Sequence, residues 1–416
     1  MKKTIPILLS LVMLLNLLCA CGTSEPPLIT DVAAKCLTAE LTTNPPTVAT
    51  QDATPVLDFG LNMLKQSAGA ENATYSPLSA YLALALAADG ASGQTKAQFE
   101  QLLGGDQQQY DSLSRNLINR LTQTDGSTKV EIANSVWIQQ DFPANGDYLQ
   151  NAVDYFDADI FTADLPTNAT CEAINQWVSD KTNGEIPKMM EKNANSNAVL
   201  LLLNALYFDG KWETPFPSGA TGHRDFHTGS GQTIPCDFMV DDEHTRLYFA
   251  EDGMDGVILS YDCGRYAMMA IRPTTGDLND LLQMLDAQAI RSALENAQET
   301  DLLLRIPKFS FDTGMELNQM LQDMGLTEAF GAQADFSALT DGKNEAYISE
   351  VVQKVKIDVA EDGTRAAAAT KIELAEKAAC IEPPQEVCFD HPFVYCILDT
   401  ETAAPLFLGT VTNPAA

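Results

Sequence analysis

The pattern of apolar and polar positions predicts a chain that mixes helices with strands. Apolar side chains recur every three or four residues over 56–64, which is typical of an amphipathic helix. Residues 78–88 are apolar on every face, and the preceding Ser76-Pro77 pair is typical of a helix start, so this helix is expected to be buried. Polar and apolar residues alternate over 130–138, as in a strand with one buried face.

The remainder of the chain continues this mixture. The apolar run 198–208 predicts a strand covered on both faces, followed by a turn at 209–212. Because helices and strands are interspersed without a regular βαβ alternation, we expect an α+β fold in one large domain. Further helices are predicted around 113–121, 174–178, 277–296 and 314–324, and strands within 224–272 and 386–412.

The segment 361–379 contains a second alternation, in which every charge between Thr364 and Leu374 falls on one parity. This is the pattern of a half-buried strand. The four consecutive alanines nevertheless suit a helix or an exposed segment better, so the segment is able to enter a sheet without being committed to one. A plain edge strand or a solvated helix remains an alternative. The uncharged parity consists of Thr364, Ala366, Ala368, Thr370, Ile372 and Leu374.

Composition and charge narrow the classes of partner. The 416 residues are 45% hydrophobic and 20% charged, as in a globular protein, and the formal net charge is −32. Such a surface repels nucleic acid and anionic membranes, and it argues against a glycosaminoglycan activator. The chain contains no run of Lys or Arg longer than two residues that could offset this charge locally.

The first 52 residues are typical of an export signal and a linker. A positive start is followed by the apolar run 5–18 and then by Leu18-Cys19-Ala20-Cys21-Gly22, which resembles a bacterial lipobox. We therefore expect a lipoprotein signal peptide at 1–20, a lipid anchor on Cys21, a flexible tether at 21–52 and a folded domain at 53–416. Ordinary cleavage nearby is the alternative. The domain would then lie on the extracellular side of a bacterial cell membrane, or be shed or secreted.

Cysteines and histidines give little support for a metal site or an enzyme. Seven scattered cysteines remain after Cys19 and Cys21, which predicts neither a disulfide framework nor zinc ligation. His223 and His227 have a spacing seen in metal sites, but they flank a turn sequence, so we expect no metal and no cofactor. No GxSxG, Walker or HExxH motif occurs.

An ordered series of segments resembles the serpin family of serine protease inhibitors. Each segment alone is a weak signal, but the series is specific and covers about residues 55–414. The segments are Ser76-Pro77-Leu78-Ser79, residues 174–178 with 182–186, residues 204–216, Ile306-Pro307-Lys308-Phe309, residues 361–370, Asp390-His391-Pro392-Phe393 and residues 405–409.

The resemblance implies three β-sheets, about nine helices and an exposed reactive-centre loop. In such proteins a target protease attacks the loop and forms an acyl-enzyme, and the cleaved loop then inserts as a strand into the main sheet. The hinge would be Glu361 and Gly363, and the uncharged parity from Thr364 to Leu374 would face the core. A bulky or charged residue at Ala366 or Ala368 would stall insertion.

The resemblance also implies a reactive bond. In inhibitory members the scissile residue lies sixteen positions after the hinge glutamate, which gives the Lys377–Ala378 bond here. Lysine at this position suits a trypsin-like protease, whose specificity pocket carries a carboxylate. The parity break at Glu376 independently ends the insertable strand just before this bond. Because the neighbouring alanines are small, a shift by one or two bonds would favour an elastase-like target.

Five further residues match the region where the family's main sheet opens: Ser76, Ser79, Asn204, Gln353 and Lys308. Gln353 stands where histidine is usual, and if it meets Asn204 the two amides can hydrogen-bond and keep the sheet closed. Lys308 and Glu361 match a family ion pair, which would contribute only about 0–1 kcal/mol if it is exposed. Arg365 stands where an acidic residue is common, but on the charged parity.

Several functions stay open at this point. The leading one is a monomeric, non-enzymatic inhibitor of an extracellular serine protease that touches the membrane only through its lipid anchor. A cysteine protease target is an alternative, as is a non-inhibitory serpin that acts as a binding module, although such members tend to carry charged or bulky residues on the inserting parity. A surface lipoprotein of another fold and a hydrolase have less support.

Overall fold

The computed structural model describes residues 34–38, 41, 43–47, 51–67, 71–123, 126–165, 167–190, 200–242, 244–340, 346–364 and 384–415. The predictions for the signal peptide, for Cys21, for loop positions Ala366 to Leu374 and for the Lys377–Ala378 bond lie outside the described residues.

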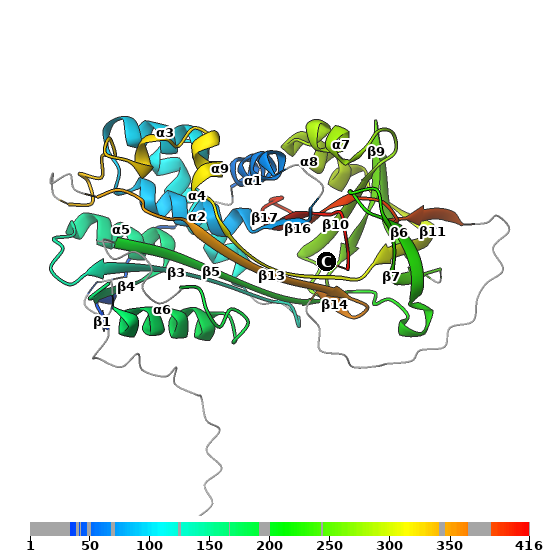
Figure 1. Cartoon of the computed structure of the whole chain (residues 1–416), viewed down its shortest axis with the longest axis horizontal. Coiled ribbons are helices and arrows are strands. Elements are labelled where there is room, and N and C mark those ends of the chain that lie inside the picture. The colour runs from blue at the N-terminus through cyan, green and yellow to red at the C-terminus, as the bar shows by residue number, and fades with distance from the viewer. Residues whose placement is uncertain are drawn as a thin grey trace, which may run out of the picture.

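A seven-stranded sheet runs through the centre of the molecule (Figure 1). Helix α6 (Asn168–Lys181) packs on one face and the buried helix α2 (Pro77–Ala88) on the other. The alternating side chains of β3 (Lys129–Gln139) explain this arrangement. Val136 and Ile138 join the cluster around α2, whereas Trp137 joins the one around α6. In spatial order the strands are β1 (Ala34–Cys36), β4 (Ala158–Ala163), β3 (Lys129–Gln139), β5 (Leu200–Lys211), β14 (Gly363–Thr364), β13 (Val352–Ala360) and β12 (Phe309–Glu316).

A second sheet lies at the right-hand end of the molecule in Figure 1. The three sheets expected are not all separate, because β11 (Gln298–Pro307) bridges two of them: its first half pairs with β8 and its second half with β7 and β15. The continuous path is β2 (Ala73–Tyr75), β17 (Pro405–Val411), β16 (Phe393–Asp399), β10 (Tyr266–Pro273), β9 (Met254–Ser260), β8 (Thr245–Glu251), β11, β7 (Thr233–Asp241) and β6 (Gly222–His227), with β15 (Gln385–Cys388) beside β11.

The described residues form nine α-helices, in agreement with the expected number. Helix α2 begins as predicted, since the Ser76 side chain accepts from the Ser79 backbone N–H at 3.4 Å and Pro77 is the first helical residue. The others are α1 (Thr54–Gln66), α3 (Gly93–Leu103), α4 (Gln107–Leu121), α5 (Gly146–Phe156), α7 (Leu278–Met284), α8 (Ala287–Asn296) and α9 (Asn318–Asp323), with short 3₁₀ turns at Ser218–Ala220 and Glu328–Phe330.

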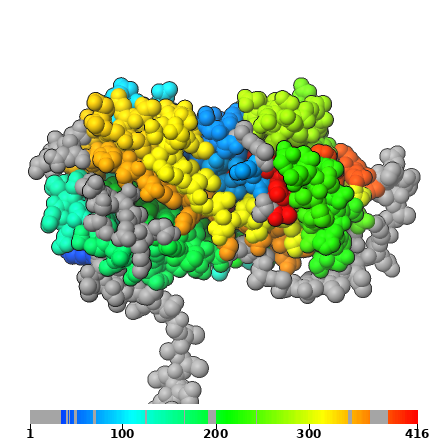
Figure 2. Space-filling view, in the orientation of Figure 1, coloured from blue at the N-terminus to red at the C-terminus, as the bar shows by residue number. Residues whose placement is uncertain are grey.

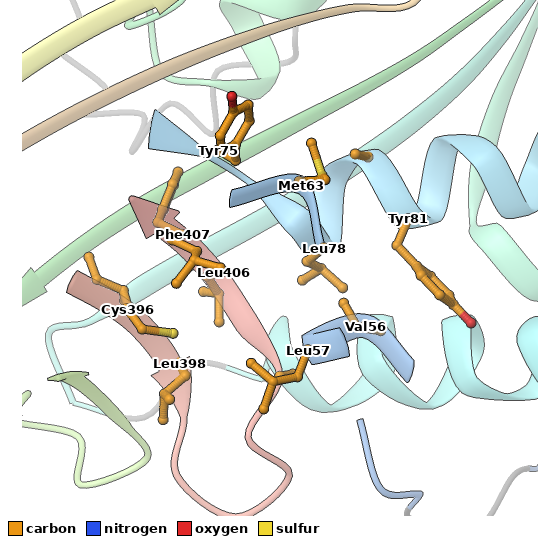
Figure 3. Close-up of a cluster of buried hydrophobic side chains, with 14 of the residues drawn as sticks. Val56, Leu57, Met63, Tyr75, Leu78, Tyr81, Cys396, Leu398, Leu406 and Phe407 are labelled. Carbon is orange, nitrogen blue, oxygen red and sulfur yellow. The ribbon is translucent and has the colours of Figure 1, made fainter. Parts of the chain in front are cut away.

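The core joins the two sheets through helices α1 and α2. Leu57 of α1 and Leu78 of α2 lie in one buried cluster with Leu406 and Phe407 of β17 (Figure 3). All four side chains are almost fully buried, which explains why α2 is apolar on every face. In the space-filling view the segment that contains β12 and β13 runs across the front of the molecule in yellow and orange (Figure 2).

Three local predictions were wrong. The helix predicted over 277–296 is two helices separated at Leu285 and Asp286, where the Asp286 side chain caps α8. The helix predicted over 314–324 begins only at Asn318, because β12 continues to Glu316 along β13. The turn predicted at 209–212 is partly strand, since Gly210 and Lys211 pair with β14.

Part of the range predicted as a tether packs on the domain. Strand β1 pairs antiparallel with β4 at the edge of the seven-stranded sheet, and Leu37 and Leu41 lie against the core. Among the described residues, no helix is both long and apolar enough to cross a membrane. The six cysteines of the described part are free thiols.

Candidate functional site

The seven-stranded sheet contains a gap between β5 and β13. The two strands run parallel, and the two-residue strand β14 pairs with both at one end. Beyond Thr364, no ladder hydrogen bond within the described part of the chain joins β5 to β13. Unpaired strand edges are templates for another strand, so the gap is a candidate site for strand addition.

Aromatic side chains and hydrogen bonds hold β14 at the hinge end of this gap. The Thr364 and Tyr261 hydroxyls lie 2.5 Å apart, and the Trp212 ring stacks on Tyr261 with centroids 4.6 Å apart. The Trp212 indole N–H donates to the Ala360 carbonyl at 2.8 Å, and its backbone N–H donates to the Asp362 carbonyl at 3.0 Å. The turn from β13 into β14 is thereby fixed on both sides.

Two facing glycines allow the backbones to meet at this end. A Cβ on Gly363 would lie 2.1 Å from the Gly210 carbonyl oxygen, and the φ of 155° at Gly363 disfavours other residues as well. A Cβ on Gly210 would lie 2.7 Å from the Tyr261 ring. Both positions therefore require glycine.

The predicted ion pair between Lys308 and Glu361 is present. Lys308 Nζ lies 2.9 Å from Glu361 Oε2, and the Thr221 hydroxyl donates to Glu361 Oε1 at 2.8 Å. The two charged side chains are only 35% and 17% exposed, so the pair is less exposed than the sequence suggested. The Phe216 backbone N–H donates to the Glu361 carbonyl at 2.9 Å, which fixes the hinge backbone.

These contacts favour the charged form of Glu361. Burial by itself would raise the pKa of the carboxyl, but hydrogen bonds from Lys308, from its own backbone N–H and from Thr221 hold that pKa below the usual value of 4.5. The hinge carboxylate is therefore ionised at neutral pH.

The opposite end of the gap opens into an apolar cavity of about 500 Å³. The cavity lies at the first residues of β5 and β13, and most of the length of helix α2 forms one of its walls. Apolar side chains of leucine, methionine and alanine form most of its walls, so they match a strand that presents mainly apolar residues. They include Ala80, Leu84, Ala87, Leu200, Leu202, Met315 and Val351.

Asn204 and Gln353 line this cavity but do not pair as expected. Gln353 instead bonds to the main chain of Ser76, accepting from its N–H at 3.0 Å and donating to its carbonyl at 2.8 Å. Asn204 donates to Asn134 Oδ1 at 2.7 Å, and Asn134 donates to the Phe156 carbonyl at 2.7 Å. The expectation fails because the gap separates the two amides. Asn204 Oδ1 has no hydrogen-bond partner in the described structure.

A buried carboxyl pair lies beside the cavity, where α2 ends. Asp89 and Asp111 are within hydrogen-bonding reach of each other, and Asp89 Oδ1 accepts from the Gln107 amide at 2.9 Å. One Asp111 oxygen and the buried Tyr148 hydroxyl have no hydrogen-bond partner among the described residues, whereas Asn151 and Tyr110 lie close enough to Asp89 to influence its ionisation. Tyr148 lines the cavity, so the pair sits directly behind its wall.

This pair favours a shared proton. Burial raises the pKa of Asp89 and of Asp111, and the nearby Asp89 charge raises that of Asp111 further, whereas Lys96 acts weakly in the opposite direction. Two carboxylates so close cannot both ionise without a large cost, so one proton lies between them at neutral pH.

Sequence reasoning found most of the hinge but missed several of its partners. Tyr261, Thr221, Gly210 and Asn134 hold or shape the site, and none was predicted. Asn134 carried a usable signal, because it interrupts the apolar parity of a predicted strand. Gly210 was part of the predicted turn 209–212, whereas Tyr261 and Thr221 lie far from the hinge in sequence and carry no local signal.

Comparisons with known proteins agree with this geometry. A family model described as "Serpin (serine protease inhibitor)" matches residues 55–414. An uncharacterized serpin-like protein of Thermococcus kodakarensis is 32% identical over 86% of this chain and 84% of its own length. Plasminogen activator inhibitor 1 of Neovison vison is 30% identical over 86% of this chain and 92% of its own. The native state of the thermophilic serpin tengpin superposes with a TM-score of 0.83 at 33% identity, covering 92% of this chain and 100% of that one.

Proposed function

Because this chain belongs to the serpin family, whose members are typically protease inhibitors rather than enzymes, we propose that it traps an extracellular serine protease. A trypsin-like target would cleave at Lys377–Ala378, and the cleaved loop would enter the gap between β5 and β13. One observation carries the proposal: the first two residues of the inserting strand, Gly363 and Thr364, already lie between those strands.

The register of β14 sets the position of every later loop residue. Thr364 lies opposite Val359 in β13 and Gly210 in β5, antiparallel to both. Continuing this register one residue at a time would place Leu374 opposite Leu200, which is the first residue of β5. The uncharged parity also ends at Leu374, so the insertable length and the length of the gap agree.

The same register would place the small loop residues against the core. Ala368 would lie between Leu206 and Val355, which are 8% and 3% exposed and belong to the cluster around α2. A side chain larger than alanine would meet these walls, and a charge would be buried without a partner.

Arg365 and Thr370 would find polar partners. Arg365, on the opposite face, would lie between Asp209 and Asp358, so the unusual basic residue there would be matched in charge. Thr370 would lie between Asn204 and Gln353, where its hydroxyl could donate to the unpaired Asn204 oxygen.

The trapping chemistry would follow from the order of events. The serine oxygen of the protease attacks the Lys377 carbonyl carbon, the Ala378 amine takes a proton and leaves, and Lys377 stays joined to the enzyme as an ester. Insertion of about twelve residues at ~3.3 Å each would form a strand roughly 40 Å long and carry that ester with it. At about 0.5–1.5 kcal/mol per ladder bond, insertion would supply on the order of 10 kcal/mol to distort the enzyme.

Incubation with trypsin and, separately, with an elastase would test the proposal. We expect an SDS-stable complex with trypsin on a denaturing gel and a released peptide that begins at Ala378 by mass spectrometry. A complex only with elastase, at a bond one or two residues away, would replace the target class. Clean cleavage without a complex and with full residual protease activity would contradict inhibition and favour a non-inhibitory binding module.

A matched pair of variants would test insertion itself. Ala368→Glu should keep cleavage but lose the complex, since the carboxylate would lie between Leu206 and Val355. Ala367→Glu should still trap, because its side chain would lie on the other face beside exposed Lys356. Glutamate adds no new trypsin site. Equal trapping by the two variants would show that the register or the parity is wrong.

A lipid anchor on Cys21 would place this inhibitor on the outer face of a bacterial membrane. There it would meet proteases in the surroundings rather than those of the cytoplasm. The apolar run and the lipobox-like cysteine support this location.

A further inference from the structure

Two histidines from distant parts of the sequence meet on the surface of the second sheet. His227 ends β6, and His391 lies between β15 and β16. Their ring centroids are 4.6 Å apart with the planes tilted by 34°. The His227 backbone N–H donates to the Asp390 carbonyl at 2.8 Å, which fixes the segment that carries His391 against β6. The side chain of His391 is 66% exposed.

In both rings Nδ1 is engaged and Nε2 is available. His391 Nδ1 lies 2.8 Å from Asp390 Oδ1, and in the tautomer in which Nδ1 donates to this carboxylate the lone pair is on Nε2. His227 Nδ1 lies 3.0 Å from the Thr233 hydroxyl. Neither Nε2 atom makes a hydrogen bond to another described residue. A histidine held by an oxygen at one nitrogen is the usual arrangement of a metal ligand.

We propose that His227 and His391 form a two-histidine site for a transition-metal dication such as Cu²⁺, Ni²⁺ or Zn²⁺. Imidazole nitrogen suits these ions, and Cu²⁺ should bind most tightly. Two nitrogens at ~2.0–2.1 Å from a tetrahedral ion lie about 3.4 Å apart, and the centroids of these two rings are 4.6 Å apart. The described residues hold no group of three or more His, Cys, Asp or Glu side chains around a common point, so water would complete the coordination.

The site would connect two parts of the second sheet. β6 pairs with β7 on one side, whereas the His391 segment leaves β15, which pairs only with β11 among the described strands. β6, β7 and β11 lie together at the right-hand end of Figure 1. A bound ion would tie the chain that follows β15 to the edge strand β6. This consequence is independent of the proposed protease inhibition.

Titration of the full chain, without a polyhistidine tag, with CuCl₂ and with NiCl₂ at neutral pH tests the site. We expect one saturable site per chain by calorimetry and nitrogen hyperfine structure in the electron paramagnetic resonance spectrum of bound Cu²⁺. His227→Ala and His391→Ala should each weaken Cu²⁺ binding by about tenfold or more. MgCl₂ is the control for weak binding to the many surface carboxylates.

His223→Ala is the matched control variant. His223 lies on the same strand, and its Nδ1 is also 2.9 Å from a carboxylate, that of Asp237, but within the described structure its ring contacts no other histidine. We expect this variant to bind Cu²⁺ like the parent. Binding that survives both His227→Ala and His391→Ala, binding lost in His223→Ala, or a Cu²⁺ spectrum with oxygen ligands only would overturn the assignment. Unchanged thermal unfolding of the metal-free variants excludes misfolding as the cause.

Discussion

The gap between β5 and β13 has two ends that differ in packing: one is closed by hydrogen bonds and the other opens into a cavity. At the hinge end, β14 is hydrogen-bonded to β13 and to β5, and two glycines allow the backbones to approach closely. The stacked rings of Trp212 and Tyr261 pack against the turn from β13 into β14. At the cavity end, the strands face an apolar space of about 500 Å³. The proposed insertion would therefore start at β14 and proceed toward the cavity.

The two ends also differ in their electrostatics. The hinge end contains opposite charges, Lys308 and Glu361, at 2.9 Å. Beside the cavity end lie two like carboxyl groups, Asp89 and Asp111, which tolerate each other only while they hold a proton. Low pH should reduce the stabilising contribution of the Lys308–Glu361 pair, and high pH that of the Asp89–Asp111 pair. Substitutions at the two ends should therefore change stability with opposite pH dependence.

The largest effect is expected from Gly363→Ala at the hinge. The new Cβ would lie 2.1 Å from the Gly210 carbonyl oxygen, so β14 would have to leave its place between β5 and β13. We expect a loss of about 1–3 kcal/mol of stability, as for other overpacked sites. Hydrogen exchange with mass spectrometry should show loss of amide protection in peptides that contain Thr364 and Gly210.

Gly331→Ala is the control for this substitution. A Cβ at Gly331 would meet no atom within 4 Å, and its φ of −139° is open to any residue. It should leave protection of the hinge unchanged. Equal protection of Thr364 in the Gly363→Ala variant would show that β14 does not depend on close backbone approach.

A smaller effect of opposite sign is expected from Asp111→Asn beside the cavity. The folded-state pKa of Asp111 is raised above its usual value of 3.8, so protonation stabilises the fold at low pH and this contribution is lost as the pH rises through the raised pKa. The amide is neutral at every pH. We expect the variant to be more stable than the parent by about 1–2 kcal/mol near pH 8.5, with the difference shrinking toward pH 5.

Thermal unfolding at a fixed scan rate across this pH range would measure the difference. Asp58→Asn, at an exposed position of α1 whose carboxyl has no hydrogen bond with the described residues, is the control and should follow the parent. A destabilisation by Asp111→Asn that grows with pH would mean that the pair is ionised and held by a cation or by Lys96 instead.

The features of this comparison that depend on neighbouring residues could be predicted from the sequence. The Ser76-Pro77 start and the continuous apolar run 78–88 predict α2, and the parity of Thr364 to Leu374 predicts a strand that can be inserted. The hinge pair of Lys308 and Glu361 came from the resemblance to a family and is present in the structure. These features depend on residues that are close in sequence or on an ordered series of motifs.

The gap itself was not predictable, because it is a relation between β5 and β13, which are far apart in the chain. The pairing expected between Asn204 and Gln353 was wrong for this reason: the separated strands leave Gln353 to bond the main chain of Ser76. The Asp89–Asp111 pair was not predicted either, because an aspartate next to the end of a helix looks like an ordinary solvent-exposed polar residue. The loop residues from Arg365 onward and the Lys377–Ala378 bond lie outside the described residues and stay predictions.

The smallest effect is expected from Glu361→Gln, which sharpens the contrast in pH dependence. The glutamine can still accept from the Thr221 hydroxyl but loses the charge that faces Lys308. The folded-state pKa of Glu361 lies below the usual 4.5, so the carboxylate stabilises the fold above that pH and this contribution disappears as the pH falls through the lowered pKa.

We therefore expect Glu361→Gln to cost about 1 kcal/mol near pH 7 and to match the parent in acid, the reverse of the trend for Asp111→Asn. Thermal unfolding from about pH 7 to pH 4 measures it, with the exposed Glu299→Gln as the control. A cost that persists unchanged in acid would assign the role of Glu361 to hydrogen bonding alone. In that case the two ends of the gap would differ in packing but not in charge.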